Sequence, residues 1–203
     1  MSANSRPTDD ASAEGLRDRK RRETRQRIAE TALRLFLADG FDGTTLDVIA
    51  AESGISRRTF FSYFKSKDDI LLFSQDAHWR AMYDDLLKTS PDVSPLEAVR
   101  DIMVKYMARY TTEEMVAIDT LMRSSATLQS RKQAFYAEQE QVLFAHLCEV
   151  WRQPERRTAL RMVAMVSMGA MRVTTQTWNE QPGPRRPMAK LLRETFEGLK
   201  SEL

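Results

Sequence analysis

The residues best suited to chemistry in this chain form a short polar run, Arg57, Arg58, Thr59, Ser62 and Tyr63. Arginine pairs with the edge of guanine, and guanidinium and hydroxyl groups bind phosphate oxygens. The run therefore suits contact with a nucleic acid. Because adjacent helical residues point in different directions, we expect one arginine on bases and the other on phosphate, and the sequence leaves open which.

The elements that must present these side chains are two short helices joined by the turn Ser53–Ser56, which contains Gly54. Leu46, Ile49 and Ala50 share one face of the first helix, and Ser56 is a suitable N-cap for the second. Two helices joined by a tight, glycine-containing turn are the helix-turn-helix pattern. Its second helix usually reads a DNA major groove, so the pattern favours a DNA-binding protein over an ordinary pair of surface helices.

The charge of the chain is unevenly distributed, although its formal net value is only +2. Residues 17–67 contain 12 Lys/Arg and 7 Asp/Glu, a net of +5, whereas residues 68–203 contain 18 and 19, a net of −1. Residues 1–16 contribute 1 and 3, a net of −2. Positive charge thus collects around the helix-turn-helix, as a phosphate-binding surface requires. We expect the basic run 17–27, including Arg21 and Arg25, to be a DNA-contacting arm rather than a solubility tail.

The same region resembles the N-terminal domain of the TetR family of bacterial transcriptional regulators. The resemblance covers about residues 22–72, and its most specific part is the segment 61–71 with Tyr63, Phe64, Lys65, an acidic pair and Ile70-Leu71. It implies that Thr45, Ser62 and Tyr63 contact phosphates, that Arg57, Arg58 and Thr59 read base edges, and that Lys67 anchors the DNA backbone. The aromatic pair Phe60-Phe61 and the long basic arm also resemble a branch of the family that senses acyl-CoA-type ligands.

The periodicity of the remaining chain predicts an all-α fold, with no segment of strand period. We expect a disordered tail over residues 1–16, a three-helix DNA-binding domain over 17–66 and a larger helical bundle over 67–203. Capping patterns mark further helix starts at Thr44–Asp47, at Ser66–Asp69, at Ser94–Glu97 and at Thr111–Glu114. Later helices are expected over about 127–152 and 154–179 and from Pro187 to near the end of the chain.

The larger bundle is the candidate site for a small molecule, as the resemblance implies. Methionine adapts to irregular apolar shapes, and tyrosine and tryptophan combine an apolar body with a polar group. Each of these residues could equally be ordinary core. Arg172 lies within an apolar helix and is expected to pair either with an acidic ligand or with Glu194 of a second chain. The expected ligand-binding residues are Trp79, Met82, Tyr83, Met103, Tyr106, Tyr110, Met122, Met168, Arg172 and Trp178.

The last two helices, about residues 155–201, carry wide apolar faces and are expected to form a homodimer through a four-helix bundle. Two copies would place two reading helices about one turn of operator DNA apart. The helix that starts near Lys67 would join the DNA-binding and ligand-binding regions. We therefore expect a repressor that a small, largely apolar molecule releases from its operator, and the alternative is a DNA-binding regulator without a ligand.

Other functional classes find little support in the sequence. The two histidines, His78 and His146, lie on different predicted helices without ligand-like spacing, and Cys148 is the one cysteine, so neither a metal site nor a nucleophile–base pair is expected. We expect no catalytic residue and no cofactor. The polar N-terminus and the absence of a long apolar run predict neither a signal peptide nor a membrane span, and hence a cytoplasmic, nucleoid-associated bacterial protein.

Overall fold

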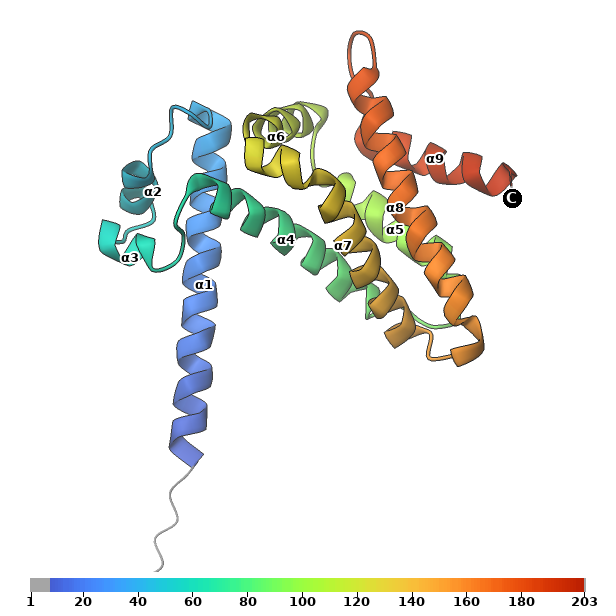
Figure 1. Cartoon of the computed structure of the whole chain (residues 1–203), viewed down its shortest axis with the longest axis horizontal. Helices are drawn as coiled ribbons and strands as arrows, with labels where there is room; N and C mark the ends of the chain where they lie inside the picture. The colour runs from blue at the N-terminus through green and yellow to red at the C-terminus, as the bar shows by residue number, and fades with distance from the viewer. Residues whose placement is uncertain (1–7, 203) are drawn as a thin grey trace, which may run out of the picture. The chain divides into compact units, whose positions relative to one another are not determined.

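The computed structural model describes residues 8–202, with side chains over 15–201. Within that range the chain forms nine α-helices and one 3₁₀-helix, with no strand (Figure 1). The predicted all-α fold is therefore confirmed. The chain divides into two compact units between Gln75 and Asp76, and a single helix, α4 (Lys67–Leu86), contributes residues to both.

The first unit contains α1 (Thr8–Asp39), α2 (Leu46–Glu52), α3 (Arg57–Phe61) and the first turns of α4. Its core joins all four helices through side chains that are almost fully enclosed, namely Ile28 and Phe36 of α1, Ile49 of α2, Phe60 of α3, Phe64, and Ile70 and Leu71 of α4. Of the three apolar residues on one face of the first short helix, Ile49 and Ala50 are buried and Leu46 is half-buried. This packing holds the short α3, which is far below the length that is stable alone.

The first helix is longer than predicted. Residues 8–16, which we expected to belong to a disordered tail, form the first turns of α1, and residues 1–7 lie outside the described range. The basic run 17–27, which we expect to be a DNA-contacting arm, is also part of this helix. Arginine, lysine and glutamate are good helix formers, so local propensity favours a helix over the basic run 17–27.

Side-chain caps start both helices of the helix-turn-helix, α2 and α3. Thr45 Oγ1 accepts a hydrogen bond from the Val48 amide, and Ser56 Oγ accepts one from the Thr59 amide. The expected box at Thr44–Asp47 is wrong in detail, because the Asp47 carboxylate binds Arg57 instead of returning to the backbone. Gly54 closes the turn with a φ of 66°. Glycine adopts this left-handed conformation without strain.

The second unit contains the rest of α4, α5 (Pro95–Met107), α6 (Thr112–Ser124), α7 (Ala126–Val150), α8 (Arg157–Glu180) and α9 (Met188–Glu202). Thr111 and Glu114 form the predicted capping box at the start of α6. Ser94 is the N-cap residue of α5, but its side chain makes no capping bond. Pro154 opens a 3₁₀ turn, η1 (Pro154–Arg156), and α8 follows it directly.

The core of the second unit lies among α4, α5, α7, α8 and α9. Its most enclosed members include Met103, Leu147, Ala164 and Leu192. A smaller cluster forms where Trp178 of α8 packs on Met188 and Leu191. Within residues 8–202, no helix combines the length and the hydropathy that a membrane span requires.

Candidate nucleic-acid interface

The exposed face of α3 carries Arg57, Arg58 and Thr59, the first part of the polar run. Phe60 is fully buried and anchors the helix, which leaves Arg57, Arg58, Thr59 and Phe61 exposed to solvent. Because α3 has only five residues, its orientation depends on the Phe60 anchor and on the Ser56 cap. The structure therefore brings together on one short helix the residues predicted to read base edges.

The two neighbouring arginines have different surroundings. Arg57 Nη1 lies 3.1 Å from Asp47 Oδ2 on α2, and its guanidinium group also lies over the ring of Phe61, 5.7 Å from the centroid. Arg58 has no side-chain partner among the described residues and is exposed. Arg57 is thus held on the protein surface, whereas Arg58 is free to reach a base edge. Asp47 and Phe61 were not predicted to shape this face.

The hydroxyl groups at the two ends of α3 are partly engaged within the protein. Thr59 Oγ1 lies 2.9 Å from Ser56 Oγ, and Ser62 Oγ donates to the Thr59 carbonyl oxygen at 2.6 Å. A hydroxyl that donates to a carbonyl keeps its acceptor sites, whereas a phosphate needs a donor. Contact of Ser62 with a phosphate would therefore require rotation of its hydroxyl group, and that contact stays a prediction.

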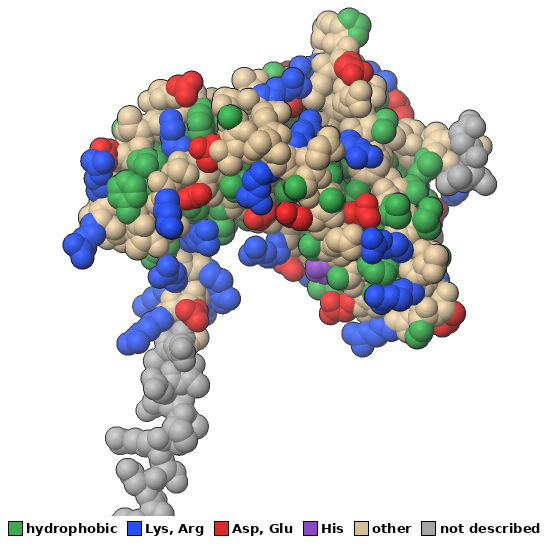
Figure 2. Space-filling view, viewed as in Figure 1, with side chains coloured by type: hydrophobic (Ala, Val, Ile, Leu, Met, Phe, Trp, Pro, Cys, Tyr) green, Lys and Arg blue, Asp and Glu red, His purple; other side chains and the backbone are tan. Residues whose placement is uncertain are grey.

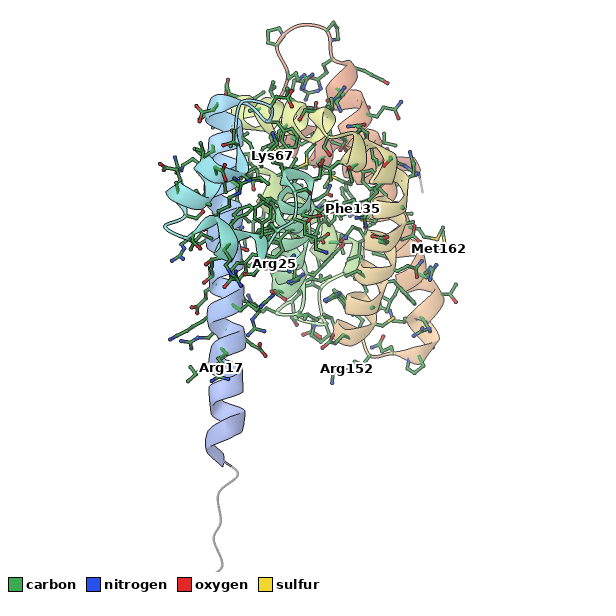
Figure 3. The ribbon with its side chains drawn as sticks, turned by 60° about the vertical axis from the view of Figure 1, so that its left-hand side comes forward. Arg17, Arg25, Lys67, Phe135, Arg152 and Met162 are labelled. Carbon is green, nitrogen blue, oxygen red and sulfur yellow. The ribbon has the colours of Figure 1, made fainter. Side chains whose placement is uncertain are left out.

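Two arginines of α1 pack against the end of α3 and the start of α4. Arg21 donates to the Ser62 carbonyl oxygen at 3.3 Å and lies over the Tyr63 ring at 5.5 Å. Arg25 lies over the rings of Phe64 and Phe73, at 5.1 and 4.5 Å. These contacts place the Arg21 guanidinium group beside Ser62 and Tyr63, which were predicted to bind phosphate, and pack Arg25, labelled in Figure 3, on two aromatic rings.

Lys67 makes internal contacts that the sequence did not indicate. Its Nζ donates to the carbonyl oxygens of Phe41 and Thr44, at 2.5 and 3.2 Å, and lies 4.5 Å from the centroid of the Phe41 ring. These bonds tie the start of α4 to the loop before α2. An ammonium group has three donors, so one N–H remains for the predicted contact with the DNA backbone.

The basic run of α1 continues beyond these contacts. Lys and Arg side chains gather along this part of the helix in Figure 2, and Arg17 projects from it in Figure 3. Arg19 Nε lies 3.3 Å from Glu23 Oε1. An exposed ion pair of this kind contributes little to stability. The run therefore forms a helical cationic surface that begins beside α3.

The predicted ligand-binding residues divide into two groups. Met82, Tyr83, Met103, Tyr106 and Met168 share one core cluster, against which Trp79 packs. Met82, Tyr83 and Met103 also line a cavity of about 10 Å³, and a cavity of that size holds at most a single water. The other four residues lie elsewhere: Tyr110 and Met122 are half-buried, Arg172 is exposed, and Trp178 belongs to the smaller cluster.

Hydrogen-bonded polar side chains lie in this core and at its edge. Tyr83 Oη donates to Gln139 Oε1 at 3.0 Å, and burial raises the pKa of Tyr83, which stays neutral. Tyr106 Oη donates to the Ala81 carbonyl oxygen at 2.6 Å. His78 Nδ1 lies 3.3 Å from Tyr110 Oη, and burial, followed by the charge of Arg109, lowers the pKa of His78. Among the described residues, no group of histidine, cysteine and acidic side chains could hold a metal ion.

One face of α8 is apolar and open to solvent. Met162, Met165 and Val173 have exposed fractions of 52, 46 and 52%, and Figure 3 shows Met162 at the surface of the helix. These three residues, called here the α8 apolar face, lie within the region predicted to form a dimer. An exposed apolar face of this kind marks a surface that another element can cover.

Comparison with known proteins agrees with this arrangement. The family described as "Bacterial regulatory proteins, tetR family" matches residues 28–72, and the "MftR C-terminal domain" matches residues 93–203, more than half of the chain. The chain is 34% identical over 105 residues to the HTH-type transcriptional regulator TcmR of Streptomyces glaucescens, covering 52% of this chain and 46% of TcmR. It is 33% identical over 98 residues to the regulator AcrR of Shigella flexneri, covering 45% and 44%.

The alignments span less than half the length of these two curated relatives, both of which are named as regulators and not as enzymes. A solved TetR-family regulator from Mesorhizobium loti has a TM-score of 0.60 at 16% identity, covering 89% of this chain and 95% of that one. At 16% identity, the likeness to this solved structure shows a shared fold alone. With both parts of the sequence matched and a helix-turn-helix that presents cationic side chains, the chain belongs to the TetR family of bacterial transcriptional regulators.

Proposed function

We propose that this protein is a dimeric, ligand-responsive DNA-binding regulator that represses transcription until a largely apolar molecule releases it from its operator. The observation that carries the DNA-binding part is the exposed face of α3, where Arg58 is unpaired beside a fixed Arg57. A cationic helix surface of this kind attracts phosphates and reads base edges.

The different surroundings of the two arginines support a division of roles. Bidentate recognition of guanine needs a free guanidinium fork. One arm of the Arg57 fork is occupied by Asp47, so Arg57 is better suited to a phosphate. Arg58 is the proposed base reader, and Thr45, Thr59, Ser62, Tyr63 and Lys67 are proposed to make further DNA contacts.

Dimer formation would supply the second reading helix. The α8 apolar face is the proposed contact, since its three residues are far more exposed than the core methionines Met103 and Met168. A second copy that covers this face would remove apolar surface from water. The pair would then bind two half-sites with specificity that one short helix does not reach alone.

Helix α4 is the proposed link between effector and operator. It runs without a break for 20 residues from Lys67 to Leu86. A helix of that length spans about 30 Å. Its first turn is tied to the loop before α2 by Lys67, and its last turns carry Met82 and Tyr83 into the core of the second unit. A ligand that moves the last turns would therefore displace the first turn.

A regulator without an effector is the second candidate, and the size of the described cavity favours it. The cavity beside Met82 and Met103 has a volume of about 10 Å³. That volume is too small for an organic molecule, so a ligand that entered this cavity would have to open the core. The two candidates make different predictions for the same measurement.

The decisive experiment begins with duplexes selected by the full-length protein from a random pool. The affinity of a selected duplex is then measured by fluorescence anisotropy with and without compounds that raise the melting temperature of the protein. Coupling between effector and operator is expected to weaken binding by about 5- to 150-fold. Compounds that bind the protein and leave duplex affinity unchanged would favour the second candidate, and failure to select any duplex would remove both.

A further inference from the structure

Two arginines face one aspartate between α6 and the loop that follows α8, and a third arginine, Arg172, lies on α8 near Tyr136. Asp119 and Arg123 lie on α6, Arg172 on α8, and Arg185 in the loop between α8 and α9. Arg123 Nε lies 2.7 Å from Asp119 Oδ2, and Arg185 Nη1 lies 3.9 Å from the same oxygen. One carboxylate oxygen thus faces two guanidinium groups, and Arg123 is the closer of them.

Tyr136 of α7 connects Arg172 to this group. Thr175, Arg172 and Asp119 all lie close enough to its hydroxyl group to act on the pKa of Tyr136, which burial raises. A raised pKa keeps the phenol protonated, so it remains a hydrogen-bond donor. The three arginines together with Asp119 and Tyr136, called here the arginine cluster, carry three positive charges against one negative charge.

The arginine cluster also contains buried polar atoms without partners. Arg185 Nη1 is enclosed and has no hydrogen-bond acceptor, because its 3.9 Å separation from Asp119 Oδ2 exceeds hydrogen-bonding distance. Asn179 Oδ1 is enclosed and unpaired as well. A charged donor buried without an acceptor is unfavourable. An anionic oxygen that entered the cluster would satisfy it.

Arg185 is held in place by contacts that do not use its hydrogen bonds. Its guanidinium group lies over the ring of Trp178, 4.3 Å from the centroid, and the Trp178 indole N–H donates to the Arg186 carbonyl oxygen at 2.8 Å. Trp178 itself is fully buried. The planar fork of Arg185 is therefore stacked on a fixed ring while its donors remain available, which is the geometry of a preorganised anion site.

Aromatic side chains lead from the arginine cluster along α7 to α4. The rings of Tyr136 and Phe135 are 6.2 Å apart, and those of Phe135 and Trp79 are 5.9 Å apart. Tyr136 and Trp79 both pack against the main core cluster of the second unit. These neighbouring rings form an apolar surface between the arginine cluster and α4.

We propose that the arginine cluster binds the carboxylate or phosphate head of an amphipathic effector whose apolar part lies along Tyr136, Phe135 and Trp79. The inference rests on the proposed effector response and specifies its chemistry: the effector is an anion. Asp119 acts as the internal competitor, since it takes the position of the bound head in the unliganded protein.

The test compares ligands that share an eight-carbon tail and differ in the head group. Octanoate, octyl phosphate, octan-1-ol, octylamine and inorganic phosphate are added to the full-length protein, and binding is followed by calorimetry and by the melting temperature. Octanoate or octyl phosphate is expected to bind and raise the melting temperature, and whichever binds more tightly identifies the head group. Octan-1-ol and octylamine are expected to bind at least about tenfold more weakly, because each lacks the charge that the arginines recognise.

Variants then separate a binding role from a structural one. Arg172→Met and Arg185→Met are each expected to weaken binding of the anion by about tenfold or more, and Arg185→Lys to restore part of it. Arg131→Met, at an exposed arginine of α7 outside the cluster, is the matched control and should leave binding unchanged. Asp119→Asn is expected to strengthen binding, since it removes the competing carboxylate.

The arginine variants and Asp119→Asn are expected to change ligand affinity in opposite directions, and this difference makes the test decisive. A purely structural cluster would lose ligand affinity in Asp119→Asn as well as in the arginine variants. Equal binding of the acid and the alcohol, or arginine variants that behave like Arg131→Met, would overturn the proposal. Arg172 is exposed, so its variant tests the cluster even if Arg185→Met fails to fold. The effect of a bound anion on duplex affinity tests the proposed function and is measured separately.

Discussion

At the scale of single residues, the same side-chain type serves different purposes within one short segment. Arg57 is paired with Asp47, Arg58 is unpaired, and Lys67 holds two carbonyl groups of its own chain. The residue types alone suggest phosphate or base contact for all three. Neighbouring groups decide which donors remain available, and those neighbours lie 10 to 26 positions away in the sequence.

The two arginines of α3 should differ in mutational effect. Arg58→Ala is expected to cost about 1–3 kcal/mol on duplexes that contain its guanine and little on duplexes in which that base pair is replaced. Arg57→Ala is expected to weaken binding to all duplexes by a similar factor, because it contacts phosphate. Affinities for a set of duplexes with single base-pair changes would check both. A loss confined to one base pair in Arg57→Ala would reverse the assignment.

His78 should make the stability of the second unit depend on mildly acidic pH. Burial and Arg109 lower its pKa below 6.5 in the folded protein, and Tyr106 and Tyr110 pack on its ring. Between the lowered value and the ordinary one the unfolded chain binds more protons, so the free energy of unfolding falls as pH decreases below about 6.5.

Melting temperatures measured at intervals from pH 7.5 to 5 are expected to fall more steeply for the wild-type protein than for His78→Gln. Asp85 does not contribute in this range, because hydrogen bonds from Lys105 and Lys88 hold its pKa well below the usual value of 3.8. Parallel curves for the two proteins would show that His78 titrates normally in the folded state.

At the scale of elements, helix ends are governed by local chemistry and helix orientation is not. Thr45, Ser56 and the Thr111–Glu114 box begin α2, α3 and α6 at the predicted residues. The basic run 17–27, which is expected to contact DNA, is part of α1. A helical run displays its charges at a fixed rise of about 1.5 Å per residue.

This helical surface should account for part of the salt dependence of DNA binding. Replacement of Arg17, Arg19, Lys20 and Arg22 by Gln keeps helix propensity and removes four charges. Each phosphate contact that is lost should reduce the slope of log affinity against log salt by about 0.9. The matched control replaces Arg131, Lys132, Arg152 and Arg156 of the second unit, and should leave the slope unchanged. An identical slope in both variants would exclude α1 from the interface.

At the scale of the whole molecule, the apolar surface of α8 is the feature that a single chain leaves unexplained. Met162, Met165 and Val173 remain exposed although methionines of the same helix, such as Met168, are buried. Two copies that share this face would protect it and place two reading helices on one operator.

The double variant Met165→Glu, Val173→Glu tests the proposed dimer. A buried, unpaired carboxylate is strongly unfavourable, so the double variant should sediment as a monomer and should lose most of its affinity for selected duplexes. Val142→Glu, at an exposed valine of α7, introduces the same group elsewhere and should remain dimeric. A dimeric double variant would place the contact on another surface.

Much of this protein follows from the sequence alone. The all-α class, the helix-turn-helix and the family resemblance depend on signals that are local in the chain, such as caps, a glycine turn and the period of apolar residues. These signals act over a few residues, so they can be read without knowing how the chain folds back on itself. Residues 8–16 are the exception, since their polarity suggested disorder although they begin α1.

Only the tertiary structure decided which side chains are available. It paired Arg57 with Asp47, enclosed Tyr83 and Trp178, left Arg172 exposed, and assembled the arginine cluster from α6, α7, α8 and the loop before α9. The physical reason is that hydrogen bonding, burial and charge interactions depend on distance in space. Residues that are far apart in the sequence become neighbours only when the helices pack.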